Sequence, residues 1–294
     1  MLPPVLQTVF EEVTQRLQTS PPCVWVHDEP TKEDLDHILK EGSTPSEFDS
    51  NNLRKEMLDA LRAKRAILLT RTSKYAKVLA VVYPEQEARI PWALFGKIFQ
   101  AFGPSARGGW RFVWFANPAP RLLPAPQTPV AAEHMNGGYT YPCDPSASVV
   151  YREEEVARVL IHEMLHAACT DSPTDMLEIK EAKTETWAEI FLVAVLAAGK
   201  PRLFSKLWRI QAQWIADQEA VLMRDHGVRG PEDYAWRYTL ARRFVLEGFG
   251  CELPDPSSGA SAVTLRFTSP WLSESQMPGS SSNESVKISY GGAK

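Results

Sequence analysis

A long apolar segment, a run of basic residues and a basic leader are all absent from this 294-residue sequence. Its longest apolar run, IFLVAVLAA at 190–198, is too short to span a bilayer, which takes about 20 residues. The opening MLPPVLQTVFEEV reaches acidic residues before the apolar core of a signal peptide forms, so we expect neither a signal peptide nor a transmembrane segment. The net charge is −4, with Lys and Arg scattered along the chain, which predicts no nucleic-acid partner and no membrane partner.

Cysteine is scarce, and its positions lie far apart at Cys23, Cys143, Cys169 and Cys251. No C-x-x-C pair and no closely spaced framework is present, so we expect free thiols in a reducing compartment. Together with the missing leader, this pattern predicts a cytoplasmic protein.

Hydrophobic residues make up 44% of the chain, which is enough to bury one large core or two modest ones. The apolar periodicity predicts an α+β protein in three parts. We expect an α/β region at residues 1–88, a second domain with a helical C-terminal part at 89–250, and a flexible tail rich in Ser, Gly and Pro at 251–294. The tail contains the apolar islands VTLRF, PWL and VKISY, which could dock as strands or bind a protein partner.

The first half of the chain alternates helical and strand patterns. Predicted helices are VLQTVFEEVTQRL (5–17), NNLRKEMLDALRAKR (51–65) and IPWALFGKIFQAF (90–102), and predicted strands are CVWVHD (23–28), AILLT with KVLAVVY as a hairpin (66–83), RFVWFAN (111–117), GGYTYP (137–142) and ASVVYR (147–152).

Four further helices are expected in the second half. The first contains LIHEMLHA and has Glu153, Glu154 and Glu155 in its first turn, where the helix dipole favours negative charge. Ser172 and Pro173 predict the start of the next, which ends near Gly199. The remaining two are expected at 202–225 and, opening on a proline, at 231–248.

His162, Glu163 and His166 form an H-E-x-x-H pattern on an otherwise apolar helix. On a helix, residues four apart project from one face, so both imidazoles could bind one small cation. A purely structural role would need a separate partner for each of the three polar groups, because an unpaired buried polar group costs about 1–3 kcal/mol. A divalent metal is one partner for both histidines, and Glu163 is placed beside it as a general base.

Glu178, Glu181, Glu185 and Glu189 step by three, four and four residues and therefore lie on one stripe of the following helix. A solvated acidic face is the alternative to a cation site for Glu178 and Glu181. It is weaker for Glu185 and Glu189, which adjoin Trp187 and the apolar run that must be buried.

These residues resemble the gluzincin branch of the zincin metallopeptidases, in which H-E-x-x-H is followed after 18 residues by a glutamate, here Glu185. The resemblance covers roughly residues 89 to 198 and implies a zincin-like domain, with a small mixed sheet, an active-site helix and a glutamate helix. It also implies one Zn²⁺ held by His162, His166 and Glu185, with Glu163 as general base and Glu189 supporting a ligand from the second shell. Several segments, among them GGYTYP and TETWAEI, are also similar to zincin-like proteins of unassigned function.

The third ligand stays open, because T-E-T-W-A-E at 184–189 lacks the asparagine usual in that family, so Glu189 could be the ligand and Glu185 its support. A metzincin pattern does not fit, since Cys169 and Ser172 stand where that group has a glycine and a histidine. By analogy with family members that stabilise the oxyanion through a tyrosine, we select Tyr238.

The resulting prediction is a zinc-dependent peptidase that acts on a peptide or protein substrate. The alternative is a catalytically inactive zincin-like protein that uses its cleft or tail to bind a partner. A protease acting on DNA-bound proteins is disfavoured by the acidic net charge.

Overall fold

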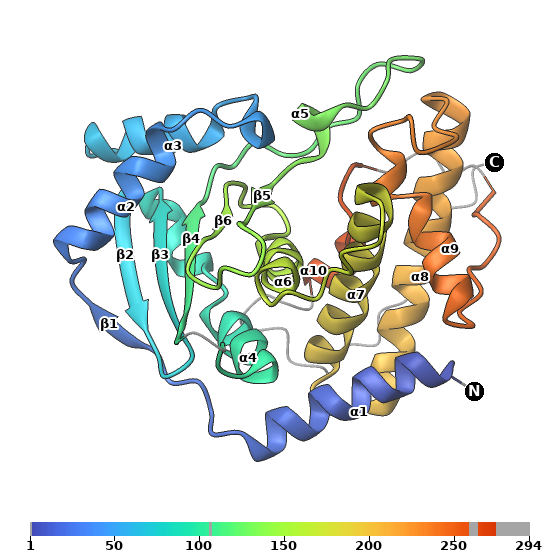
Figure 1. The fold of residues 1–294 in the computed structure, drawn as a ribbon, viewed down its shortest axis with the longest axis horizontal. Helices are drawn as coiled ribbons and strands as arrows, with labels where there is room; N and C mark the ends of the chain where they lie inside the picture. The colour runs from blue at the N-terminus through green and yellow to red at the C-terminus, as the bar shows by residue number, and fades with distance from the viewer. Residues whose placement is uncertain (1, 106–107, 259–263, 275–294) are drawn as a thin grey trace, which may run out of the picture.

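The structure is a computed structural model that describes residues 2–105, 108–258 and 264–274. Within these residues one mixed sheet has six strands in the order β1 (Val26–Asp28), β2 (Ile67–Thr72), β3 (Ala76–Val82), β4 (Trp110–Phe115), β6 (Ser148–Val150) and β5 (Gly138–Tyr139) (Figure 1). The first three strands are antiparallel, β3, β4 and β6 run parallel, and β5 returns antiparallel at the edge. The hairpin predicted at residues 66–83 is confirmed as β2 and β3.

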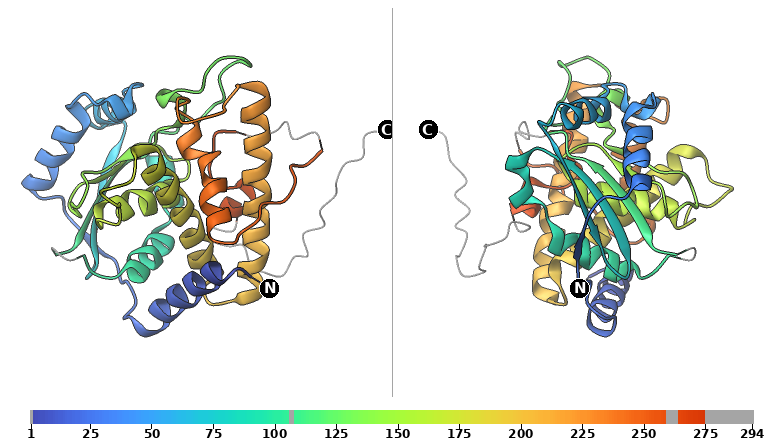
Figure 2. Two further views of the ribbon diagram at one scale, coloured as in Figure 1. Left: turned by 45° about the vertical axis from the view of Figure 1, so that its right-hand side comes forward. Right: turned by 90° about the vertical axis from the view of Figure 1, so that its left-hand side faces the viewer.

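Helices cover both faces of this sheet. One face carries α2 (Lys32–Ser43) and α3 (Leu53–Arg62), and the other carries α1 (Pro4–Thr19), α4 (Trp92–Phe102), α6 (Val156–Ala167) and α7 (Leu177–Ala197). Outside them lie α8 (Pro201–Asp225), α9 (Ala241–Gly248) and α10 (Pro270–Glu274), and Figure 2 shows the long α8 on the side away from the sheet. The shorter helices are η1 (Glu47–Asp49), η2 (Pro84–Arg89), α5 (Ala132–Met135) and η3 (Trp236–Tyr238).

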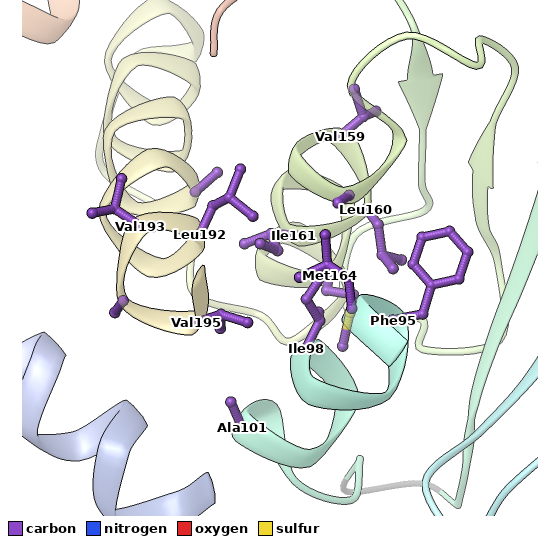
Figure 3. Close-up of a cluster of buried hydrophobic side chains, with 14 of the residues drawn as sticks. Phe95, Ile98, Ala101, Val159, Leu160, Ile161, Met164, Leu192, Val193 and Val195 are labelled. Carbon is purple, nitrogen blue, oxygen red and sulfur yellow. The ribbon is translucent and has the colours of Figure 1, made fainter. Parts of the chain in front are cut away.

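The sheet is buried on both faces because successive strand residues point to opposite sides. In β3, Val78 and Ala80 pack toward α4 and α6, whereas Leu79 and Val81 pack toward α2 and α3. Side chains of α4, α6 and α7 then close the larger core, as Figure 3 shows around Met164. The α6 helix is thereby fixed between the sheet and α7.

The predicted α+β class is confirmed, but the chain does not divide at residue 88. Strand β3, which precedes that position, pairs in parallel with β4, which follows it, from Ala76↔Trp110 to Val81↔Phe115. Residues 1–88 therefore share a sheet and a core with the rest of the protein.

Several helix boundaries differ from the predicted ones. Helix α6 begins at Val156, because Glu155 adopts a left-handed conformation at φ 59°, and the Glu155 side chain makes no capping hydrogen bond to the helix. Helix α7 begins at Leu177 rather than at Ser172, and residues 231–248 divide into η3 and the short α9. Helix α2 was not predicted, although Thr31 and Asp34 form a capping box at its start.

Residues 264–269, within the region expected to be a flexible tail, are bound along their backbone by side chains of α8. Gln218 donates to the Thr264 and Arg266 carbonyls at 2.9 and 2.8 Å, and Gln211 donates to the Phe267 carbonyl at 2.8 Å. The Glu155 carboxylate accepts from the Phe267 and Thr268 amides. The PWL island lies in α10, whereas VKISY lies outside the described residues.

The ring of Phe267 is buried within a cage of arginine side chains. It lies 4.3 Å from the guanidinium carbon of Arg158, 5.5 Å from that of Arg121 and 5.8 Å from that of Arg242. Cations over an aromatic face are stabilised by the ring quadrupole, and more so where water is excluded. Residues 264–269 therefore pack against the N-terminal end of α6 through Phe267 and Arg158.

None of the described helices combines the length and apolar character needed to cross a bilayer.

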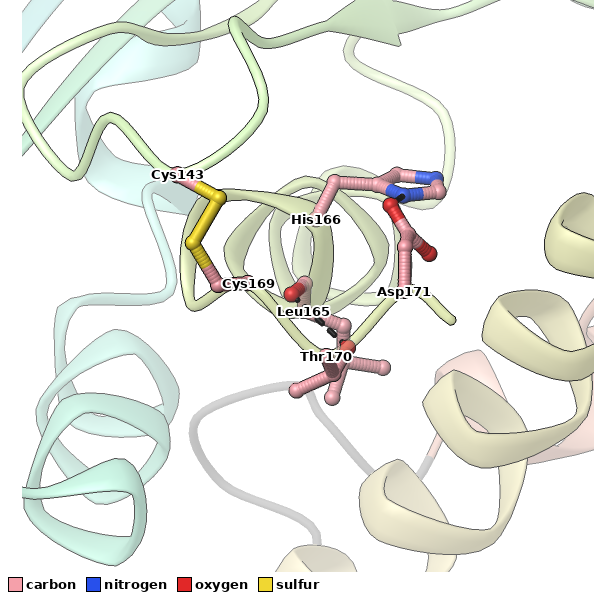
Figure 4. Close-up of a disulfide and its surroundings, with 6 residues drawn as sticks. All are labelled: Cys143, Leu165, His166, Cys169, Thr170 and Asp171. Carbon is pink, nitrogen blue, oxygen red and sulfur yellow. Dashed lines mark hydrogen bonds and ion pairs between the residues drawn. A yellow bond between two sulfur atoms is a disulfide. The ribbon is translucent and has the colours of Figure 1, made fainter. Parts of the chain in front are cut away.

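The expectation of four free thiols is wrong for two of them, because Cys143 and Cys169 form a disulfide (Figure 4). Their Cα atoms are 4.6 Å apart, and both backbone amides donate to the His166 carbonyl at 3.1 Å. The bond joins the loop after β5 to the C-terminal end of α6. Cys23 and Cys251 remain free, and because the other two cysteines are paired, the thiols no longer indicate a reducing compartment.

We expect the disulfide to contribute about 3 kcal/mol to the free energy of unfolding, because it closes a loop of 26 residues and so restricts the unfolded chain. Guanidinium denaturation of the wild type with and without reductant should show this difference. The double variant C143S/C169S should lose the same amount and no longer respond to reductant, whereas C23S should respond as the wild type does. Four reactive thiols in the denatured, unreduced wild type would contradict the pairing.

Candidate metal centre

Helix α6 presents His162 and His166 one turn apart on the side that faces α7. The two side chains are 9% and 11% exposed, and their ring centroids lie 4.7 Å apart. The Nε2 atoms face each other at 3.1 Å. The structure thus brings together the two imidazoles in the way that the H-E-x-x-H spacing predicts.

Each imidazole has a carboxylate beside its Nδ1 atom. Nδ1 of His166 lies 2.7 Å from Oδ2 of Asp171, in the loop after α6 (Figure 4). Nδ1 of His162 lies 3.2 Å from Oε1 of Glu185, at an angle that falls short of hydrogen-bond geometry. A carboxylate at Nδ1 favours the proton on that atom, so both Nε2 lone pairs point into the same small volume.

Glu181 supplies the carboxylate that faces this volume. Its Oε2 lies 3.3 Å from Nε2 of His162 and 3.7 Å from Nε2 of His166. Among the described residues, His162, His166 and Glu181 form the group of donors close enough to one another to hold a metal ion.

The other three glutamates of the α7 stripe are paired with arginines. Glu178 lies 3.2 Å from Arg237. Glu185 forms an ion pair with Arg158, and Glu189 forms one with Arg242. The structure therefore differs from the expected ligand set. Glu185, the expected third ligand, supports His162 from the Nδ1 side, and Glu189 lies a turn further away on its own arginine.

The electrostatic field of this group favours a cation. Burial alone lowers the pKa of His162, but the carboxylates of Glu185 and Glu181 outweigh burial and raise that pKa to about 10. Burial raises the pKa of Glu181, yet its contacts with the two histidines bring it well below the usual range. In the absence of a metal these carboxylates hold a proton on the imidazoles, and a divalent ion can take the place of that proton.

The donor atoms also fit zinc in their spacing. Bonds of about 2.0–2.1 Å at tetrahedral angles place ligand atoms about 3.3–3.5 Å apart. The three separations here are 3.1, 3.3 and 3.7 Å, so two imidazole nitrogens and one carboxylate oxygen form a triangle of that size. Three protein ligands leave a fourth position for water or substrate.

Glu163 lies next to the first histidine and is 5% exposed. Burial raises the pKa of its carboxyl to about 7, even though the neighbouring histidines oppose that shift. Strand β5 passes close over this carboxylate at Gly138, where an added Cβ would lie 2.9 Å from Oε1 of Glu163. A carboxyl with a pKa near neutrality can both accept and return a proton at physiological pH.

Tyr238, the expected oxyanion-stabilising residue, lies in η3, which packs against α7. Its ring centroid is 5.6 Å from that of Tyr234, whose hydroxyl donates to Asn136 at 2.7 Å. Burial raises the pKa of Tyr238 well above its usual value, and the charge of Glu181 adds to this effect. Its role in catalysis stays a prediction.

Sequence reasoning missed Arg158 and Asp171. Arg158 was visible in principle, since it precedes His162 by the same four residues that separate the two histidines. Asp171 gives no comparable signal, because it reaches His166 through the conformation of the loop between α6 and α7.

Comparison of the chain with protein-family models, curated proteins and solved structures gives no match.

Replacing Glu163 with Gln should change how the stability of the metal-free protein depends on pH. A raised folded-state pKa stabilises the protein below the unfolded value near 4.5, and this contribution is lost as pH rises through about 7. Relative to the wild type, E163Q should therefore gain on the order of 3 kcal/mol between these pH values. Denaturation in chelator across pH 4–8 measures this, with E12Q on α1 as the exposed control. Parallel stability curves for wild type and E163Q would contradict the shift.

Proposed function

We propose that this chain is a zinc-dependent peptidase that hydrolyses peptide bonds by activated water. The observation that carries the proposal is the convergence of two Nε2 lone pairs and the Glu181 carboxylate, with the carboxyl of Glu163 beside them at a pKa of about 7. This combination supports hydrolysis better than a purely structural metal site, because a closed structural site does not need a proton shuttle. The H-E-x-x-H pattern and its resemblance to the zincins agree with it.

Each residue then has a defined task. When bound, zinc would lower the pKa of water and polarise the substrate carbonyl. The carboxylate of Glu163 accepts a proton from the attacking water and returns it to the leaving amide nitrogen, so one water is consumed for each bond cleaved. Asp171 and Glu185 keep the two imidazoles oriented through their Nδ1 atoms.

Strand β5 is suited to hold an extended substrate. It lies at the end of the sheet order, and Gly138 within it passes directly over Glu163. A peptide that pairs with the outer edge of β5, where the sheet of the described residues ends, would lie along the sheet beside this carboxylate. This interpretation makes GGYTYP, rather than ASVVYR, the substrate-binding strand.

Replacing Glu163 with Gln should abolish turnover without releasing the metal. We expect kcat/KM to fall by about 10²–10⁴, because the proton shuttle is lost while the ligands stay in place. Zinc content is measured by elemental analysis, and cleavage by mass spectrometry of new N-termini in a peptide mixture. H162A should lose both zinc and activity, and E12Q should lose neither.

Two outcomes would contradict the peptidase. One is an E163Q variant that cleaves as fast as the wild type. The other is a zinc-loaded wild type that produces no new N-termini, which would favour the inactive, partner-binding alternative.

A further inference from the structure

Helices α6 and α7 meet along two facing rows of charged and polar side chains. Arg158, His162 and His166 follow one another at intervals of four along α6, and α7 presents Glu181 and Glu185 at the same interval. The rows run antiparallel, because Arg158 meets Glu185, His162 meets both glutamates and His166 meets Glu181. The register between the helices thus decides which glutamate reaches the Nε2 atoms.

Both oxygens of the Glu185 carboxylate are engaged away from those atoms. Oε2 is bonded to Arg158, and Oε1 faces Nδ1 of His162 at 3.2 Å. The side chains of Arg158 and Glu185 are each 3% exposed, so water cannot substitute for either partner. Glu181 has no arginine partner within this row and directs its Oε2 to the two imidazoles.

Arg158 is itself held from two sides. It lies four residues before His162 on the same face of a buried helix, and its guanidinium stacks at 4.3 Å over Phe267. An arginine is always charged in proteins and pairs with a carboxylate in a fixed planar geometry. Arg158 therefore competes with a metal ion for the carboxylate of whichever α7 glutamate lies opposite it.

We propose that Arg158 selects the third metal ligand: by binding Glu185 it withdraws that carboxylate from the metal volume and leaves Glu181 as the ligand. Arg158 is thus a positioning residue that acts through Glu185 and touches neither metal nor substrate. The inference rests on the metal site of the proposed function, but it is independent of peptidase activity. Without Arg158, Glu185 is the next carboxylate along α7 that already contacts a histidine, and it is left buried without its counter-charge.

The test is a comparison of two ligand variants in two backgrounds, with Zn²⁺ affinity measured by competition against a chromophoric chelator. In the wild-type background, E181Q should weaken Zn²⁺ binding by about 100-fold or more, as loss of a ligand, and E185Q by about tenfold, as loss of a supporting group. In the R158M background this difference between the two variants should disappear. E181Q should then cost at most about tenfold, because the released Glu185 replaces the missing carboxylate.

The absorption spectrum of bound Co²⁺ provides a second readout that simple loss of stability would not change. It should be altered strongly by E181Q in the wild-type background and much less by E181Q in the R158M background. R242M is the matched control, since it breaks the equivalent buried pair with Glu189 and should leave the ligand order unchanged. R158Q, which removes the charge but keeps hydrogen-bonding groups, replaces R158M if that variant does not fold.

Three results would overturn the inference. The first is an E181Q cost that is the same within about twofold in both backgrounds, and the second is an E185Q cost in the wild-type background that exceeds that of E181Q. The third is a wild type that binds no Zn²⁺, which would also remove the proposed function. If R158M makes E181Q tolerable in a protein that cleaves no peptide, the inference is supported and the peptidase alone is contradicted.

Discussion

The contact between α6 and α7 is the constraint on which the rest of the structure depends, because it places ionisable side chains between two buried helices. Removing a charge from water costs several kcal/mol even after relaxation, so each group needs a partner in place. Glu185 and Glu189 receive arginines, and the imidazoles receive carboxylates at their Nδ1 atoms. What is left is a pair of Nε2 lone pairs facing Glu181, a set that only a proton or a metal cation completes. The contact that packs the two helices therefore also creates the position that a proton or a cation would fill.

Much of the fold follows from local patterns in the sequence. The β2–β3 hairpin and α4 were predictable because their apolar residues recur with the period of the element itself. Helix α2 was missed because two of its four buried residues are the acids Asp34 and Glu41, which an apolar pattern does not register. The pairing of β3 with β4 could not be predicted either, since the two strands are separated by a helix and meet only in the folded sheet.

The candidate site also combines features that local sequence patterns predict with features that depend on tertiary structure. The histidines come together because the geometry of one helix fixes residues four apart on one face. The choice of Glu181 depends instead on how far one helix is shifted along another, which spacing within α7 cannot reveal. The ion pair between Arg158 and Glu185 forms only at one such shift. The contact of Asp171 with His166 and the Cys143–Cys169 bond also depend on tertiary structure, because loops must fold back onto α6 to form them.

The position of residues 264–269 in the sequence affects when the surroundings of Arg158 can form during translation. These residues are held by α8 and by Glu155, and Phe267 stacks on the same arginine that binds Glu185. A growing chain releases both histidines from the ribosome well before this segment is made, since α7, α8 and α9 must be translated in between. The arginine cage can close only after residues 264–269 have been made, so the surroundings of Arg158 are completed later than α6 itself can form.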